Sequence, residues 1–248
     1  MAESSIEWTE HTWNPVTGCS KVSPGCKNCY AETMARRLQA MKAPGYARGF
    51  KLALHAARLE QPLRRQAPTV YFVNSMSDLF HKDVPDSFIE QVLAVAEATP
   101  QHTYQVLTKR ADRLPRFFAG RAAPPNVWLG VSVENRRHGV PRIAQLRQVQ
   151  ASVRFLSVEP LLEDLGTLDL RGIHWVIVGG ESGAKARPMR PEWADGVRAQ
   201  AADQGVAFFF KQWGAWGADG VRRDKKRNGR QLAGRLWHEF PVPVVAAA

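Results

Sequence analysis

The stretch TVYFVNSMSDLFHKDVPDSFIEQVLAVAEATPQHTYQVLTKR, residues 69–110, contains two short apolar runs with a helical pattern between them. The runs at 69–73 and 103–107 are continuously apolar rather than alternating, which is typical of parallel strands covered on both faces. Residues 86–99 show the helical pattern. The stretch therefore predicts a strand–helix–strand unit of a parallel sheet.

The same alternation continues along the chain. Further apolar runs of strand length lie at 126–133, 153–158, 173–179 and 206–210, a short segment at 12–17 precedes them all, and helical patterns occur at 30–41 and 191–204. Repeated βα units at this spacing predict an α/β fold, a partial TIM-like (β/α) barrel of about six to seven units. An open doubly wound sheet is the competing architecture.

The strand pattern ends near residue 214, which sets the predicted domain boundary. We expect residues 1–214 to form the barrel and residues 215–248 to form a basic extension that packs on it or is partly mobile. The extension contains VRRDKKRNGR, residues 221–230, with six basic residues and one acidic residue, and it ends in the apolar FPVPVVAAA, residues 240–248.

Net charge narrows the class of partner. The 248 residues include 34 Lys and Arg against 23 Asp and Glu, a formal net charge of +11. Such a surplus attracts polyanions and favours a nucleic-acid partner, the alternative being a basic protein without one. The chain opens without a basic-then-apolar leader and has no apolar run long enough to cross a bilayer, so we expect a cytoplasmic protein with no membrane partner.

All three cysteines lie in one loop, residues 18–30, as Cys19, Cys26 and Cys29. An odd, clustered set is a poor disulfide framework and predicts metal binding. A structural zinc site needs a fourth ligand, which His11 or His81 would supply. Three thiolates alone suit a [4Fe–4S] cluster with one iron left open.

The chain resembles a bacterial and phage family of three-cysteine-motif proteins of unassigned function and, more broadly, the radical S-adenosylmethionine (radical SAM) superfamily. The motifs that carry the resemblance are NPVTGCSKVSPGCKNCYAE (14–32), SMSDLF (75–80), TKR (108–110), GVSVEN (130–135), SVEPLL (157–162), VGGESG (178–183) and FFFKQWG (208–214). The superfamily resemblance implies a cluster that binds SAM, receives an electron from a donor such as flavodoxin or ferredoxin, and yields a 5′-deoxyadenosyl radical.

This chain departs from the superfamily pattern in two places. The usual spacing is C-x3-C-x2-C, whereas here it is C-x6-C-x2-C, and the aromatic Tyr30 follows the last cysteine instead of preceding it. The superfamily's Gly-Gly-Glu element normally follows the second strand, but here it begins at Gly179, after the sixth.

Strand order then assigns the cofactor contacts that the resemblance implies. Active-site groups of a barrel follow the carboxyl ends of its strands. We expect Asn74 and Ser75 near the SAM amine, and Ser132 and Glu134 near its carboxylate or ribose. Glu159 shares the rim with Glu134, and Gly179 and Gly180 would let the backbone approach the adenine.

The substrate is expected to be a nucleic acid, DNA more than RNA. The residues predicted to contact it are Asp78, Lys109, Arg110, Arg187, Lys211 and Trp213 at the mouth, and Arg222 and Arg223 in the extension. The basic side chains would attract phosphates, and Trp213 would stack on an unpaired base. The alternatives are that the arginines pair with Glu134 and Glu159, and that the tryptophan packs in the core.

A more distant resemblance is to spore photoproduct lyase, which repairs a thymine dimer by hydrogen abstraction and commonly relies on a further cysteine. This chain has no fourth cysteine. Tyr71 or Tyr104 would then return the hydrogen, unless 5′-deoxyadenosine does so or both tyrosines are core residues. The hypothesis of a different class is a non-catalytic nucleic-acid-binding protein stabilised by zinc or an iron–sulfur cluster.

Overall fold

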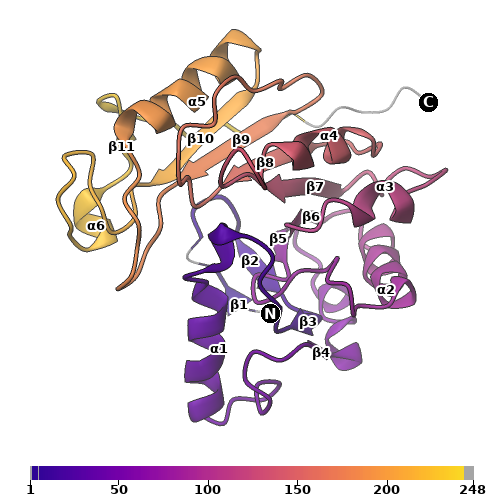
Figure 1. Cartoon of the computed structure of the whole chain (residues 1–248). Helices are drawn as coiled ribbons and strands as arrows, with labels where there is room; N and C mark the ends of the chain where they lie inside the picture. The colour runs from indigo at the N-terminus through magenta and orange to yellow at the C-terminus, as the bar shows by residue number, and fades with distance from the viewer. Residues whose placement is uncertain (1, 5, 243–248) are drawn as a thin grey trace.

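A computed structural model describes residues 2–4 and 6–242, and its centre is one eight-stranded sheet (Figure 1). The strands follow the order β1 (Ala2–Glu3), β2 (His11–Trp13), β5 (Val70–Val73), β6 (Thr103–Thr108), β7 (Val127–Ser132), β8 (Arg154–Val158), β9 (Trp175–Gly179) and β10 (Ala207–Gln212). Only β1 is antiparallel to its neighbour; the other seven run parallel.

The strand order decides between the two predicted architectures. Apart from the separate β3–β4 ribbon, the strands from β2 to β10 lie in the sheet in the order of the sequence, and the sheet curls into a half-barrel. A doubly wound sheet reverses its strand order at a switch point, and no reversal occurs here. The predicted partial TIM-like barrel is therefore confirmed.

The helices are α1 (Tyr30–Ala40), α2 (Asp86–Glu97), α3 (Arg113–Phe117), α4 (Pro141–Arg147), α5 (Pro191–Asp203) and the short α6 (Lys225–Asn228). Buried side chains of α2, α3, α4 and α5 pack on the outer face of the sheet, whereas α1 packs in a separate cluster with Tyr46 and Met76, and α6 has no buried residue. The short elements are η1 (Pro24–Cys26), η2 (Ala56–Arg58), η3 (Pro62–Arg64), the ribbon β3 (Val16–Thr17) with β4 (Ala53–Leu54), and the hairpin β11 (Gln231–Leu232) with β12 (Arg235–Leu236). None of the helices in the described part of the chain has the length and apolarity needed to cross a bilayer.

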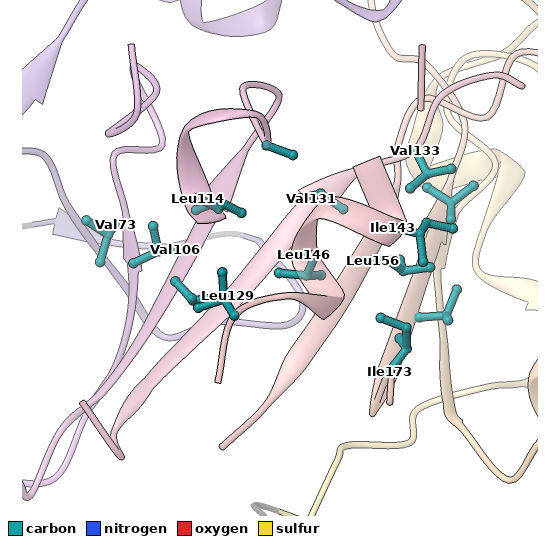
Figure 2. Close-up of a cluster of buried hydrophobic side chains, with 14 of the residues drawn as sticks. Val73, Val106, Leu114, Leu129, Val131, Val133, Ile143, Leu146, Leu156 and Ile173 are labelled. Atoms are coloured by element: carbon teal, nitrogen blue, oxygen red, sulfur yellow. The ribbon is translucent and has the colours of Figure 1, made fainter. Parts of the chain in front are cut away.

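The larger core lies between the sheet and the helices. Val106, Leu129 and Leu156 come from three successive strands and share one buried cluster with Leu146 of α4 and Leu114 of α3 (Figure 2). Side chains alternate between the two faces of a strand, so the residues between these point into the barrel.

A second buried cluster fills the floor of the barrel. It consists of Trp8, Phe72, Phe155, Trp175, Ile177 and Phe209. Gly130 makes room for it, because a Cβ at this position would lie 2.4 Å from the ring of Phe155. The lower half of the lumen is therefore full and largely apolar, and the buried Gln105 within it donates to Trp8 O at 3.2 Å.

The extension packs against the free edge of β10. Phe210 N donates to Trp237 O at 3.1 Å, Glu239 N donates to Phe208 O at 3.2 Å, and Leu232 is buried in the main core. The part of the predicted extension at 243–248 lies outside the described residues. The domain boundary at residue 214 stays a prediction.

The floor packing predicts that Gly130→Ala destabilises the protein by about 1–3 kcal/mol, because the added methyl group overpacks a closed aromatic layer. Urea denaturation measures the change. Gly196→Ala is the matched control: Gly196 lies within α5, and no atom lies within 4 Å of the added Cβ. The control should stabilise the helix by up to about 1 kcal/mol. Equal stability of the two variants would contradict the closed floor.

Candidate active site at the barrel mouth

The cysteine loop connects β3 to α1 and lies over the carboxyl ends of the strands. It begins at Gly18, which has a φ of 78° and no room for a Cβ, since that atom would lie 2.2 Å from Lys51 O. Cys26 ends η1, and Cys29 is the residue directly before α1. All three cysteines are free and partly exposed. The predicted loop thus places its three thiols at the mouth.

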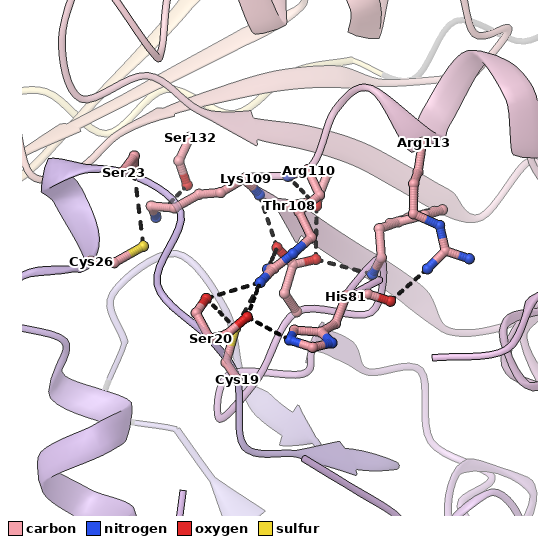
Figure 3. A network of polar contacts seen from close by, with 12 residues as sticks. Cys19, Ser20, Ser23, Cys26, His81, Thr108, Lys109, Arg110, Arg113 and Ser132 are labelled. Carbon is pink, nitrogen blue, oxygen red and sulfur yellow. Dashed lines mark hydrogen bonds and ion pairs between the residues drawn. The ribbon is translucent and has the colours of Figure 1, made fainter. Parts of the chain in front are cut away.

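Arg110 ties the first cysteine to the barrel (Figure 3). Its Nη1 donates to Asp78 Oδ2 at 3.0 Å and to Cys19 Sγ at 3.5 Å, and its Nη2 donates to Ser20 O at 2.9 Å. Burial raises the pKa of the Cys19 thiol, the charge of Asp78 adds to this, and Arg110 opposes both. The guanidinium therefore favours the thiolate that metal binding requires.

Asp78 holds this arginine through a saturated set of contacts. Its Oδ1 accepts from Thr108 Oγ1 at 2.7 Å and from Phe80 N at 3.0 Å, while Oδ2 also accepts from Lys109 N at 3.1 Å. Asp78 is buried, so the structure uses it as a support for Arg110. Its predicted contact with substrate remains untested.

Glu134 supports the middle of the loop from below. It is fully buried, and Arg142 Nη1 of α4 donates to its Oε2 at 2.6 Å. A Cβ on Gly25 would lie 3.0 Å from Glu134 Cγ, so the loop backbone rests directly on this side chain. Burial alone would raise the pKa of Glu134, but the hydrogen bonds and charge of Arg142 outweigh it and hold that pKa below its ordinary value.

Glu181 anchors the far side of the loop. Arg187 donates to both of its oxygens, at 2.6 and 2.9 Å, and Asn28 Nδ2 donates to Oε2 at 3.0 Å. Arg187 Nη2 also reaches Pro24 O at 3.1 Å. Burial opposes ionisation of Glu181, yet the bonds from Arg187 and Asn28 lower its pKa overall. The predicted substrate residue Arg187 is thus part of a clamp on the loop.

The upper lumen below the loop is polar. Lys109 Nζ donates to Ser132 Oγ at 2.9 Å, and Lys211 Nζ lies 3.1 Å from Glu159 Oε1. Ser157 Oγ donates to Glu159 Oε2 at 3.3 Å. The structure therefore brings these predicted cofactor and substrate residues together, with two ammonium groups beside the opening.

Asn74 and Ser75 lie just after β5, beside the start of the cysteine loop. Asn74 has a φ of 60°, and its Oδ1 accepts from Val16 N at 3.1 Å. Among the described residues, its buried Nδ2 has no hydrogen-bond partner. Ser75 Oγ bonds the side chain of Asn14, and Ser75 O accepts from Tyr30 OH.

Packing requires glycine at position 180, where the backbone of Trp213 is close, whereas Gly179 faces the movable end of the Glu159 side chain. A Cβ on Gly179 would lie 2.4 Å from Glu159 Oε1, and one on Gly180 would lie 1.9 Å from Trp213 O. The close neighbours are thus protein atoms of the adjacent strands. Contact of these glycines with adenine stays a prediction.

The two tyrosines lie away from the mouth. Tyr71 and Tyr104 belong to the outer core cluster, and their rings stack 5.5 Å apart. Tyr104 OH bonds Thr99 Oγ1 at 2.6 Å, and Thr99 precedes β6, at the amino-terminal end of the strands. The arrangement agrees with the alternative interpretation, core packing, and we do not carry either tyrosine into the proposed site.

Trp213 and the arginines of the extension are also engaged by the protein. Trp213 is only 3% exposed, and its Nε1 donates to Gln231 O at 2.8 Å. Arg223 forms a bidentate pair with Asp219 at 2.6 and 2.8 Å. Arg222 donates to Ala184 O. In this structure the tryptophan offers no free face to a base.

The histidines expected to complete a zinc site have other partners in this structure. Within the described residues, no three His, Cys, Asp or Glu side chains are arranged to hold a single metal ion. His81 Nε2 bonds Ser20 Oγ at 2.8 Å and its Nδ1 accepts from Asp83 N at 3.2 Å, while His11 packs its ring against Tyr71. A four-iron cube is larger than one ion and takes one thiolate on each of three irons, which suits the three thiols of this loop.

Sequence reasoning missed three members of the site. Arg142, Glu181 and Asn28 hold the loop, but none was among the predicted site residues. Glu181 had a signal, because it follows a buried strand within the Gly-Gly-Glu element. Arg142 lies on a helix among other arginines, and nothing in the sequence marks its partner.

Comparison with known proteins identifies the family. The model of a family described as protein of unknown function (DUF5131) matches residues 3–241. The chain belongs to this family. Family membership agrees with the resemblance carried by the cysteine loop and the strand-end motifs. No curated protein matches the chain.

Solved structures of spore photoproduct lyase are similar to the chain. One, complexed with dinucleoside spore photoproduct, has 14% identity and a TM-score of 0.49, with 81% of this chain and 63% of that chain covered. A variant with bound AdoMet and the same dinucleoside has 15% identity and a TM-score of 0.46, with 71% and 57% covered. The chain thus spans about three fifths of the length of these lyases.

The Glu134–Arg142 pair predicts a pH-dependent stability. Glu134→Gln should cost about 3–5 kcal/mol at neutral pH, because it leaves a buried guanidinium without its counter-charge. Because the pKa of Glu134 is lowered on folding, its contribution is full above the unfolded carboxyl pKa of about 4.3 and is lost as the pH falls through the folded value.

Urea denaturation of wild type and variant at several pH values measures this difference. The gap in unfolding free energy should shrink below about pH 4. Glu192→Gln, which removes an exposed carboxylate from α5, is the control and should change little. A constant gap across the titration would show that the carboxylate charge does not hold the loop.

Proposed function

We propose that this protein is a radical SAM-type enzyme that acts on a nucleic acid, with DNA preferred over RNA. The observation that carries the proposal is the docking of three free thiols, without a fourth cysteine, over the polar mouth of a parallel half-barrel. The reaction class is repair of a DNA photoproduct or modification of a base. The proposal includes a reducing cytoplasm and an electron donor such as flavodoxin or ferredoxin.

Cys19, Cys26 and Cys29 would hold a [4Fe–4S] cluster as thiolates. When bound with SAM, the reduced cluster would supply a 5′-deoxyadenosyl radical for hydrogen abstraction. Arg110 donates to the first of these sulfurs, so it stabilises the ligating form of the thiol. The anchors Glu134 and Glu181 keep the loop backbone fixed over the lumen.

The lumen residues would bind and orient SAM. The ammonium groups of Lys109 and Lys211 suit a carboxylate, while Ser132 and Glu159 suit hydroxyl groups of a ribose. The apolar floor formed by residues such as Phe155 and Trp175 closes the barrel from below and excludes water from that side. Neither N–H of the buried Asn74 Nδ2 has a partner among the described residues, so this amide beside the loop is a donor that SAM could use.

Anaerobic reconstitution with iron and sulfide tests the cluster. The full-length protein should bind about four iron and four sulfide per chain. With SAM and dithionite it should release 5′-deoxyadenosine and methionine. Cys19→Ala, Cys26→Ala and Cys29→Ala should each lose most of the iron and all SAM cleavage, because each removes one of the three ligands.

Lys27→Ala is the matched control, since Lys27 is an exposed residue of the same loop. It should retain iron and SAM cleavage. Full occupancy by zinc without iron, or a stable cluster that never cleaves SAM, would contradict the enzyme and leave a metal-stabilised binding protein.

A further inference from the structure

A basic groove opens beside the cysteine loop, outside the lumen. It has a volume of about 750 Å³ and is formed by three segments: residues 20–22 of the cysteine loop, residues 82–86 before α2, and residues 109–116, which include the start of α3. Six of its lining side chains are basic and two are acidic. The groove therefore favours an anionic ligand.

Two of its cations are available to a ligand. Arg110 and Arg113 are paired with Asp78 and Asp86, so they serve the fold. Lys21 is paired with Glu32 of α1 at 3.0 Å. Lys82 and Arg116 are exposed, and within the described residues neither forms an ion pair or a side-chain hydrogen bond. Both therefore present their charges to solvent along the groove.

Lys109 connects the groove to the lumen. It lines the groove, and its Nζ reaches Ser132 Oγ at the end of β7. Figure 3 shows this side chain passing between Arg110 and Ser132 over the strand ends. A chain of negative charges lying on Lys82 and Arg116 would be led toward the cysteine loop, because residues 20–22 of that loop line the same groove.

We propose that this groove binds the phosphodiester backbone of a single-stranded nucleic acid and leads it to the barrel mouth. This inference rests on the proposed function, in which the nucleic acid reacts at the barrel mouth. A concave path lined by isolated cations fits a thin, regularly charged strand. Docking of an acidic globular protein needs a broad surface of about 800 Å² per partner instead.

The basic extension is the obvious competitor, and the structure argues against it. Its Arg222 and Arg223 are bonded within the protein, and α6 lies beyond the β10 edge of the sheet, on the other side of the mouth from α3 (Figure 1). Lys225 and Lys226 on α6 are exposed, as Lys82 and Arg116 are. They provide a control pair with the same charge.

The test uses the full chain, both as purified and after anaerobic reconstitution. Fluorescence anisotropy measures binding of a labelled single-stranded DNA, a single-stranded RNA of the same sequence, and duplex DNA across a salt titration. The double variant Lys82→Gln/Arg116→Gln (the groove variant) is compared with the double variant Lys225→Gln/Lys226→Gln (the α6 variant), which is the control. Thermal unfolding of both variants checks that the fold is intact.

The groove variant should bind the single strands about tenfold more weakly near 0.1 M salt, and the salt slope should fall by about 1.4, since each phosphate contact contributes about 0.7. The α6 variant should bind like wild type. Comparing the affinities for the DNA and the RNA strand shows which of these two nucleic acids, which share a phosphodiester backbone, the groove prefers.

Three outcomes would overturn the groove assignment. In the first, the wild-type protein binds neither single-stranded DNA nor single-stranded RNA. In the second, the groove variant and the α6 variant weaken nucleic-acid binding equally. The third is a groove variant that binds nucleic acid normally but is reduced more slowly by flavodoxin, which would assign the groove to an acidic protein. SAM cleavage with dithionite is measured separately. Failure of the proposed enzyme function can therefore be distinguished from failure of the groove to bind nucleic acid.

Discussion

Ion pairs between carboxylates and arginines hold the cysteine loop on the barrel, and the candidate site depends on them. Asp78 with Arg110 and Glu134 with Arg142 are buried, and the third pair joins the buried Glu181 to the partly exposed Arg187. In each pair the carboxylate follows a strand, whereas the arginine comes from the next strand end, a helix or the same loop. A buried pair tolerates little displacement, because separating the partners leaves an unpaired charge out of water. These pairs thereby hold the loop on the barrel.

This use of the carboxylates leaves positive charge at the mouth. Asp78, Glu134 and Glu181 are paired with arginines. Lys109 donates to the Ser132 hydroxyl and its charge also acts on Glu134, while Lys82 and Arg116 have no ion-pair partner among the described residues. Part of the net positive charge of the chain therefore lies beside the mouth, where an anionic ligand would enter. The same structural pairs account for both the rigid loop and the basic opening.

The sequence predicted the fold well because the decisive signals are local. Continuous apolar runs such as 103–107 mark buried parallel strands, and α2 follows from periodicity within residues 86–99. Roles at the rim were harder to predict, since a partner such as Arg142 for Glu134 is set by packing across elements. Tyr104 and Gln105 are neighbours in one strand, so their side chains point to opposite faces of the sheet. The sequence shows this alternation but does not show which of the two faces lines the lumen, so it could not predict that Tyr104 points outward.

The central claim is that three thiols hold a four-iron cluster and leave one iron without a protein ligand. Mössbauer spectroscopy of the iron-57 protein, recorded with and without SAM, measures this most directly. The account predicts one iron site that differs from the others and whose parameters change when SAM is added, because SAM would coordinate at that iron. Four equivalent, fully protein-ligated irons that do not respond to SAM would contradict it.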